Sequence, residues 1–302
     1  MIASPVTGTT VVSHVRQIPA ALIIESYRKE FDVNVSRFFA GVPNVDLYEC
    51  GDTGYRFYHP FDVAGDAELY ECLQRIPWYY SGNKEEHRVA LKLAVLGQLV
   101  LEVGCGDGKF LHMLREKGLD SVGLEFNVCA VNKAISQGFV VYHESVEEHA
   151  RQNDGQYDIV ASFQVLEHVV DVKGFLSASL QALRHGGFFI VSVPNNDAAY
   201  HANCDDPLNM PPHHIGQWGF NSLIALQNYF PIRLERLETD TSTPAAWAGQ
   251  KAMQAAKEHL NSRYGFIANP ICQMGKKFIS FGAQAMLRYI PGQTVTAIFR
   301  KV

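Results

Sequence analysis

The stretch LVLEVGCGDGKFL, residues 99–111, decides the fold of this chain. Its first five residues, four of them aliphatic, are typical of a strand buried on both faces of a parallel sheet. Three glycines follow, at Gly104, Gly106 and Gly108. Residues without a Cβ accept positive φ angles and let the backbone approach a ligand closely. The sequence then resumes at helical spacing, so we expect a strand, a tight turn and a helix whose N-terminus faces a small polar or anionic ligand.

The spacing of the glycines separates the classes of ligand. A dinucleotide fingerprint needs G-x-G-x-x-G, but here Lys109 stands in the sixth position and the third glycine comes one residue early. A phosphate-binding Walker loop needs a hydroxyl residue after Gly-Lys, where this chain has Phe110. With Glu102 the pattern becomes E-x-G-x-G-x-G, which resembles motif I of the class I S-adenosylmethionine-dependent methyltransferases.

Composition sets the limits of the other classes. The chain has 302 residues, 47% of them hydrophobic, and can bury a large core. Its net charge of −5 gives no sign of a nucleic-acid partner. The six cysteines form no C-x-x-C pair, so neither a zinc ribbon nor a disulfide framework is indicated, and reduced thiols in the cytoplasm are expected. Neither a cleavable apolar leader nor an apolar run of about 18 residues is present, so no membrane span is expected.

From residue 99 onward, strands and helices alternate. Strands are predicted over 99–103, 121–124, 139–142, 157–163, 188–193, 232–238 and 294–300, and helices after the glycine turn and over 128–137, 171–184, 221–229, 245–260 and 272–289. Ser145 and Glu148 form a capping box that starts another helix at residue 146. A double glycine at 186–187 is expected to separate a helix from the next strand. The pattern predicts an α/β fold with a Rossmann-like, seven-stranded, mostly parallel sheet and helices on both faces.

Residues 1–85 do not alternate in this way, and we predict that they form an N-terminal helical and aromatic cap or lid. Helices are expected over 18–31, 66–75 and 84–96, and an aromatic hairpin over 47–61. The favoured interpretation of these aromatic residues is that they pack a small core. Tyr80 is a candidate lid residue on the cofactor. Residues 86–302 then form the main domain, with a helical insertion at about 243–291 between the last two strands.

Two longer runs extend the resemblance. Residues 143–171, HESVEEHARQNDGQYDIVASFQVLEHVVD, and residues 182–195, ALRHGGFFIVSVPN, resemble the ubiquinone-biosynthesis O-methyltransferases and their small-molecule and glycan-modifying relatives. The resemblance covers residues 84–230 and implies that one strand of the sheet is antiparallel. It also implies S-adenosylmethionine as cofactor and S-adenosylhomocysteine as product.

Residues for the cofactor follow from both arguments. Glu125 ends the second strand about twenty residues past the glycine turn, where an acid accepts hydrogen bonds from ribose hydroxyls. The resemblance implies that residues 104–106 contact the methionine part of the cofactor, mainly through their backbone. It also implies that residues 145–146 border the adenine and that residues 163–164 flank the sulfonium and the adenosine. The expected cofactor-binding residues are Tyr80, Glu102, Gly104, Cys105, Gly106, Gly108, Glu125, Phe126, Ser145, Val146, Phe163 and Gln164. Cys105 is not expected to act as a nucleophile, because methyl transfer proceeds by direct displacement.

A base for the acceptor is sought among the histidines. The sulfonium is already activated, so the enzyme must orient the acceptor and remove its proton, which suits a neutral imidazole. His168, after the fourth strand, is the first candidate catalytic residue. His213 and His214, in the irregular segment 195–217, are the second, although for each a loop histidine bonded to the backbone is the favoured alternative.

A metal ion is not predicted. Quinone O-methyltransferases of this type can carry E-x-x-E-H after the fourth strand, a set suited to a divalent ion. Here Gln164 replaces the first glutamate, and a neutral amide is a poorer ligand for a hard cation. Glu167 and His168 remain, and His213 or His214 is the only replacement nitrogen considered.

The predicted function is methyl transfer from S-adenosylmethionine to a small-molecule or sugar-like glycan acceptor, at oxygen, by in-line displacement with histidine assistance. One alternative is a non-catalytic cofactor-binding subunit that acts through its C-terminal helices. The same helices are also considered as the contact of a homo-oligomer. A nicotinamide-dependent dehydrogenase is the third possibility.

Overall fold

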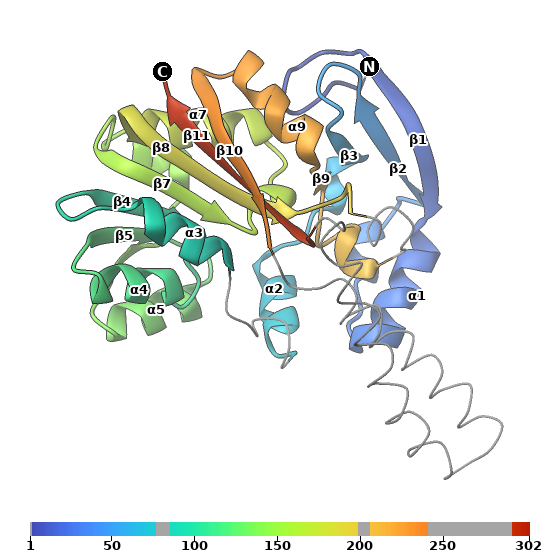
Figure 1. Cartoon of the computed structure of the whole chain (residues 1–302). Coiled ribbons are helices and arrows are strands. Elements are labelled where there is room, and N and C mark those ends of the chain that lie inside the picture. Colours follow the sequence, from blue (N-terminus) through green and yellow to red (C-terminus); the bar gives the residue numbers. More distant parts are fainter. Residues whose placement is uncertain (1, 77–84, 199–205, 241–291) are drawn as a thin grey trace, which may run out of the picture.

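The computed structural model describes residues 2–76, 85–198, 206–240 and 292–302 and is built around two β-sheets (Figure 1). The larger sheet has seven strands: β4 (Leu99–Val103), β5 (Asp120–Leu124), β6 (Val140–Tyr142), β7 (Tyr157–Phe163), β8 (Leu183–Pro194), β10 (Ile232–Thr239) and β11 (Thr294–Lys301). Their order is β10-β11-β8-β7-β4-β5-β6, and β11 runs in the direction opposite to the other six strands. The predicted fold class is confirmed.

The strand order indicates where a ligand would bind on the larger sheet. The chain passes from β4 outward to β5 and β6, then returns to β7 on the other side of β4. Ligands of open α/β sheets bind at such a switch point, outside the carboxyl ends of the strands. The glycine turn follows β4 at this edge of the sheet.

Helices cover both faces of the larger sheet, as predicted. One face packs on α3 (Glu85–Leu93), α4 (Lys109–Glu116) and α5 (Val128–Ser136). The other packs on α6 (Val146–Ala150), α7 (Val172–Ala182) and α9 (Phe220–Ala225), which the short helix η5 (Leu226–Asn228) continues. Alternate strand residues enter the two cores: Leu101 faces α7, whereas Val100 faces α4.

A second, antiparallel sheet was not predicted in full. Its order is β1 (Val12–Pro19), β2 (Asn44–Cys50), β3 (Arg56–His59) and β9 (Gly216–Gln217). The expected hairpin over 47–61 is β2 and β3, but β1 takes the start of the helix expected over 18–31, so that α1 runs Ala20–Phe31. The last strand, β9, comes from the segment expected to be irregular, so this sheet joins the N-terminal part to residues 206–218.

The remaining elements of this half pack beside the second sheet. They are α2 (Ala67–Gln74) and the short helices η1 (Ser36–Phe39), η2 (Phe61–Val63) and η4 (Pro207–Asn209). Tyr55, Phe57 and Tyr58 are fully buried, which confirms that the aromatic residues of this region pack a core. Asp66 caps α2 by accepting from the Leu69 backbone N–H at 3.1 Å.

One boundary in the larger sheet differs from expectation. β8 begins at Leu183, five residues before the predicted strand. Its pairing with β7 is interrupted before Phe188, and Gly186, with φ 74°, lies in the interruption. The glycine pair therefore makes an irregularity within the strand instead of preceding it. The helices predicted over 245–260 and 272–289 lie outside the described residues.

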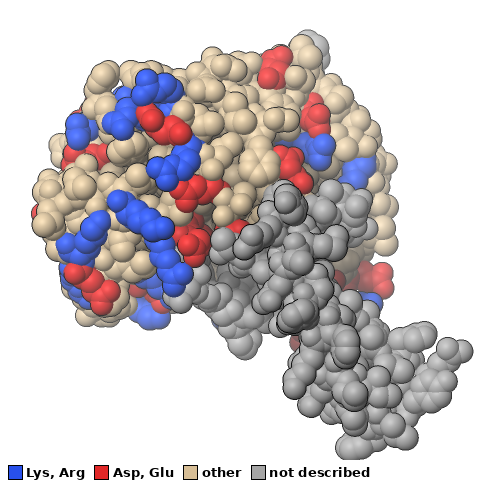
Figure 2. All heavy atoms as spheres, in the orientation of Figure 1, with Lys and Arg blue, Asp and Glu red and all other residues tan. Residues whose placement is uncertain are grey.

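The surface carries both signs of charge. Basic and acidic side chains are interspersed over the half of the molecule built on the larger sheet in Figure 2. Among the residues that the structure describes, no helix has the length and apolar character needed to cross a bilayer.

Candidate functional site

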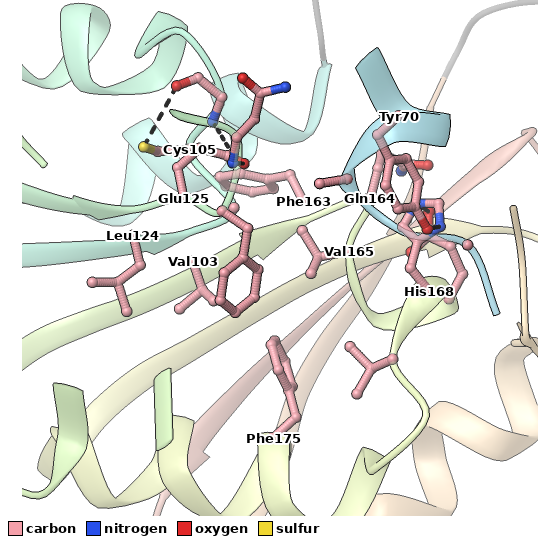
Figure 3. Close-up of a pocket in the computed structure, with 18 of the residues that line it drawn as sticks. Tyr70, Val103, Cys105, Leu124, Glu125, Phe163, Gln164, Val165, His168 and Phe175 are labelled. Atoms are coloured by element: carbon pink, nitrogen blue, oxygen red, sulfur yellow. Dashed lines mark hydrogen bonds and ion pairs between the residues drawn. The ribbon is translucent and has the colours of Figure 1, made fainter. Parts of the chain in front are cut away.

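A cavity of about 1030 Å³ opens at the carboxyl ends of β4, β5 and β7. Thirteen of the predicted site residues line it: Glu102, Gly104, Cys105, Gly106, Glu125, Phe126, Ser145, Val146, Phe163, Gln164, His168, His213 and His214. Figure 3 shows Cys105 and Glu125 on one side of this cavity and Tyr70 and His168 on the other. Tyr80 lies outside the described residues. Gly108 does not line the cavity; it is the N-cap residue of α4 and has φ 86°.

The glycine turn is fixed to the neighbouring strand. The backbone N–H groups of Gly104 and Cys105 both donate to the Leu124 carbonyl, at 2.8 and 3.0 Å. Gly104 has φ 79°, and a Cβ there would collide with Cγ2 of Val165. Glycine is therefore required at this position for two reasons: the backbone has a positive φ angle, and the space beside it has no room for a Cβ.

Glu125, at the end of β5, accepts hydrogen bonds from the backbone of the glycine turn and of its own loop. One carboxylate oxygen accepts from the Gly106 N–H and the other from the Asn127 N–H, each at 2.8 Å. A carboxylate offers about four lone-pair positions, so two bonds fix its orientation and leave capacity for ligand hydroxyls. This geometry suits the ribose role predicted for Glu125, which stays a prediction.

Cys105 is a buried thiol in the turn. Burial, with the nearby carboxylates of Glu102 and Glu125, raises its pKa far above the usual range. A thiol is nucleophilic only as the thiolate, and Cys105 is therefore unreactive at neutral pH.

The predicted capping box is present at the start of α6. The Ser145 hydroxyl accepts from the Glu148 N–H at 3.1 Å, while the Glu148 carboxylate accepts from the Ser145 N–H at 3.0 Å. These bonds hold Ser145 and Val146 at the cavity, beside the exposed ring of Phe126.

Gln164 is held in an unusual conformation at the end of β7. It is a non-glycine residue with φ 58°, and its backbone N–H donates to the Ser192 carbonyl at 2.9 Å. Its buried amide nitrogen has no hydrogen-bond partner within the described part of the chain. Such strain and unmet hydrogen bonding are typical of ligand-binding positions.

Three histidines meet at the opposite end of the cavity. His168 lies on η3 (Leu166–His168), and His213 and His214 follow η4. The ring of His168 lies 4.7 Å from that of His213 and 4.9 Å from that of His214, and the last two rings stack at 4.4 Å. The three candidates, predicted as alternatives, form one group, which we call the histidine cluster.

The Nδ1 atom of each ring in the histidine cluster faces an oxygen. His168 Nδ1–H donates to the His213 carbonyl at 2.6 Å, and His213 Nδ1–H to the Leu208 carbonyl at 2.8 Å. His214 Nδ1–H faces the Asn209 side-chain oxygen at 3.2 Å. Since these oxygens accept only, each neutral ring carries its lone pair on Nε2.

His168 and His213 are neutral at pH 7. Burial lowers the pKa of His168 to about 4, although the carbonyls of His213 and Gln164 act in the opposite direction. Burial and the nearby His168 likewise lower the pKa of His213 well below its usual value. Neutral imidazoles can accept protons or bind metal ions.

Sequence reasoning missed several residues at this end of the cavity. Tyr70 on α2 approaches His168 Nδ1 to 3.2 Å and donates to the His213 carbonyl at 3.3 Å. Asn209 supports His214, and Asp66 and Gln74 also line the cavity. Asp66 was readable as a helix cap, but no local signal shows that this face of α2 meets residues 206–214.

The sheet order, its single antiparallel strand and the glycine turn with an acid after the next strand define a class I S-adenosylmethionine-dependent methyltransferase. A family model described as "Methyltransferase domain" matches residues 82–237, slightly more than half of the chain. The chain belongs to this methyltransferase domain family, and the class and the cofactor expected from the sequence are confirmed.

Curated relatives share this region. A ubiquinone biosynthesis O-methyltransferase of Pectobacterium carotovorum is 33% identical over 162 residues, covering 52% of this chain and 65% of that protein. That of Escherichia fergusonii is 36% identical over 161 residues, covering 51% and 64%. The chain thus matches less than two thirds of the length of either relative. A solved S-adenosylmethionine-dependent methyltransferase from Archaeoglobus fulgidus aligns over 78% of this chain and 95% of its own, with 18% identity and a TM-score of 0.45.

Proposed function

We propose that the chain transfers the methyl group of S-adenosylmethionine to a hydroxyl oxygen of a small-molecule acceptor, a sugar-like one included. The observation that carries this proposal is that the glycine turn and the histidine cluster line one cavity from opposite sides. A volume of about 1030 Å³ is enough for a nucleoside cofactor and a small acceptor together. The O-methyltransferase names of the curated relatives favour oxygen over nitrogen or carbon.

The reaction needs little from the protein beyond position and proton removal. The acceptor oxygen attacks the methyl carbon in line with the carbon–sulfur bond, which breaks with its electron pair retained by sulfur. The products are a methyl ether and S-adenosylhomocysteine. The acceptor proton leaves toward the histidine cluster, in which the rings of His168 and His213 are neutral and able to receive it or to assist its loss. Gln164, beside Phe163 at the end of β7, borders the reacting atoms in this arrangement.

The non-catalytic alternative gains no support. It relied on helices within residues 243–291, which lie outside the described residues, and the homo-oligomer contact considered there stays a prediction. The described cysteines, Cys50, Cys72, Cys105 and Cys129, are free thiols, which is in keeping with the cytoplasmic location expected.

The test is product identification. Purified chain is incubated with S-adenosylmethionine labelled in the methyl group and a small-molecule extract of the source cell, and labelled products are analysed by mass spectrometry. We expect a base-stable methyl ether that is absent with the Gly104→Ala variant. Label found only on nitrogen or carbon would contradict O-methylation, and tight cofactor binding without any labelled product would favour the non-catalytic alternative.

A further inference from the structure

We propose that His168, His213 and His214 form a binding site for a divalent transition-metal ion of the zinc type. The acceptor role given to the ion below rests on the proposed function, whereas the site itself does not.

The three histidine side chains lie close enough together to share one ion. One ring nitrogen from each of the three histidines lies within 4.8 Å of the other two. A tetrahedral zinc ion with bonds of about 2.1 Å holds its nitrogens roughly 3.4 Å apart. The widest separation exceeds this value by roughly 1.4 Å. Small rotations of the side chains can close this gap, because two of the ligands are neighbours on one short segment and the third faces them.

Each of the three histidine rings is held by an oxygen atom at Nδ1. Metal-binding histidines donate the N–H of the other ring nitrogen to a carbonyl, amide or carboxylate oxygen, which fixes the tautomer. Here His168 and His213 donate to backbone carbonyls, and His214 faces the oxygen of Asn209. Asn209 is itself oriented, since its amide nitrogen donates to Asn196 Oδ1 at 2.7 Å. Three separate supports thus present three Nε2 lone pairs.

The charged side chains that line the cavity around the histidine cluster are mainly acidic. Among its described lining residues the cavity has nine carboxylate side chains and a single lysine. Glu167 is almost fully buried, and its Oε1 lies 3.9 Å from His168 Nε2, on the side where the ion would bind. A buried carboxylate beside a group of ring nitrogens favours a cation at that position.

The donor set selects the class of metal. Imidazole nitrogens suit zinc, cobalt and nickel, whereas magnesium and calcium prefer oxygen ligands. With Gln164 in place of a carboxylate, this site differs from the carboxylate-rich set expected for a hard ion. Three nitrogen ligands also leave a position open for an oxygen of the substrate.

The open position gives the ion its role. An ion held by His168, His213 and His214 would lower the pKa of an acceptor hydroxyl at the open position, so that the hydroxyl would release its proton to bulk water. Its oxygen would then take the methyl group, the carbon–sulfur bond would break with its electron pair kept by sulfur, and the ion would be unchanged.

The site is tested on the full chain with zinc alone. Protein dialysed against a chelator and then against metal-free buffer is titrated with Zn²⁺ by calorimetry, and bound metal is counted by mass spectrometry. We expect one ion per chain and a loss of at least tenfold in affinity in His213→Ala and in His214→Gln. His112→Ala, which alters a surface histidine on α4, is the matched control and should bind zinc like the wild type. S-adenosylhomocysteine binding by each variant shows that the fold is intact.

The outcomes separate the two proposals. A wild-type chain that binds no stoichiometric zinc, or variants with intact cofactor binding that retain zinc, would overturn the metal site. Methyl transfer that continues undiminished after chelation would overturn the role of the ion in the reaction and leave the proposed function standing. Zinc binding lost only in the cluster variants supports the site, even if no methyl acceptor is found.

Discussion

At the scale of single residues, Gly104 combines a left-handed backbone conformation with a close neighbour, at a position predicted to bind the cofactor. Its φ of 79° and the closeness of Val165 leave no room for a side chain. We predict that Gly104→Ala lowers the affinity for S-adenosylhomocysteine at least tenfold, measured by calorimetry, and destabilises the fold by about 1–3 kcal/mol, measured by denaturant unfolding.

Gly41 provides the control for this prediction. It has φ 77°, but no atom lies within 4 Å of the position that a Cβ would occupy. Gly41→Ala should therefore cost only the backbone strain, about 1 kcal/mol, with cofactor affinity unchanged. Equal effects of the two substitutions on binding would show that the space beside Gly104 does not matter.

His168 tests the acceptor side at the same scale. Replacing it removes one member of the histidine cluster, so we expect His168→Ala to reduce the turnover number by about 100-fold. Affinity for S-adenosylmethionine should change little, because the glycine turn and Glu125 are untouched. Tyr70→Phe, which removes a hydroxyl 3.2 Å from His168 Nδ1, should give a smaller loss. Near wild-type turnover in His168→Ala would refute any part for this ring in catalysis.

At the scale of elements, the capping box of α6 is a locally encoded structure. The two reciprocal bonds between Ser145 and Glu148 satisfy backbone groups that a short helix cannot satisfy itself. Ser145→Ala is expected to lower the free energy of unfolding by about 1 kcal/mol, while Ser145→Thr, which keeps a hydroxyl, should lose less than half of that. Chemical denaturation measures both, and equal losses would contradict the capping role.

Sequence predicted the elements whose signals are local. The glycine turn, the capping box and the buried runs of β4 and β7 each depend on residues close in the chain, and these were placed well. β1 was missed because most of its side chains are exposed, so it shows no alternation of apolar and polar residues. β9 has two residues and exists only through its pairing with β3, about 160 positions away. The histidine cluster likewise joins residues 45 positions apart.

At the scale of the whole molecule, the two sheets share cores. Tyr55 of the N-terminal part packs against Trp218, with ring centroids 4.2 Å apart, and both belong to the core under the larger sheet. We therefore predict that residues 85–302 alone do not unfold cooperatively or bind S-adenosylhomocysteine. Co-expression with residues 1–84 should restore both, as seen by circular dichroism and calorimetry. A fragment that folds and binds unaided would support the predicted division at residue 85 as an independent domain boundary.

The walls of the cavity come from different parts of the chain. The wall predicted to bind the methyl donor comes from β4, β5 and β7, inside the region that the family model matches, whereas Tyr70 on α2 comes from outside it. The segment that carries His213 and His214 is attached through β9 to the N-terminal sheet. A change in the N-terminal sheet would therefore reshape the histidine side of the cavity first, whereas the residues at the ends of β4, β5 and β7 are held by the larger sheet.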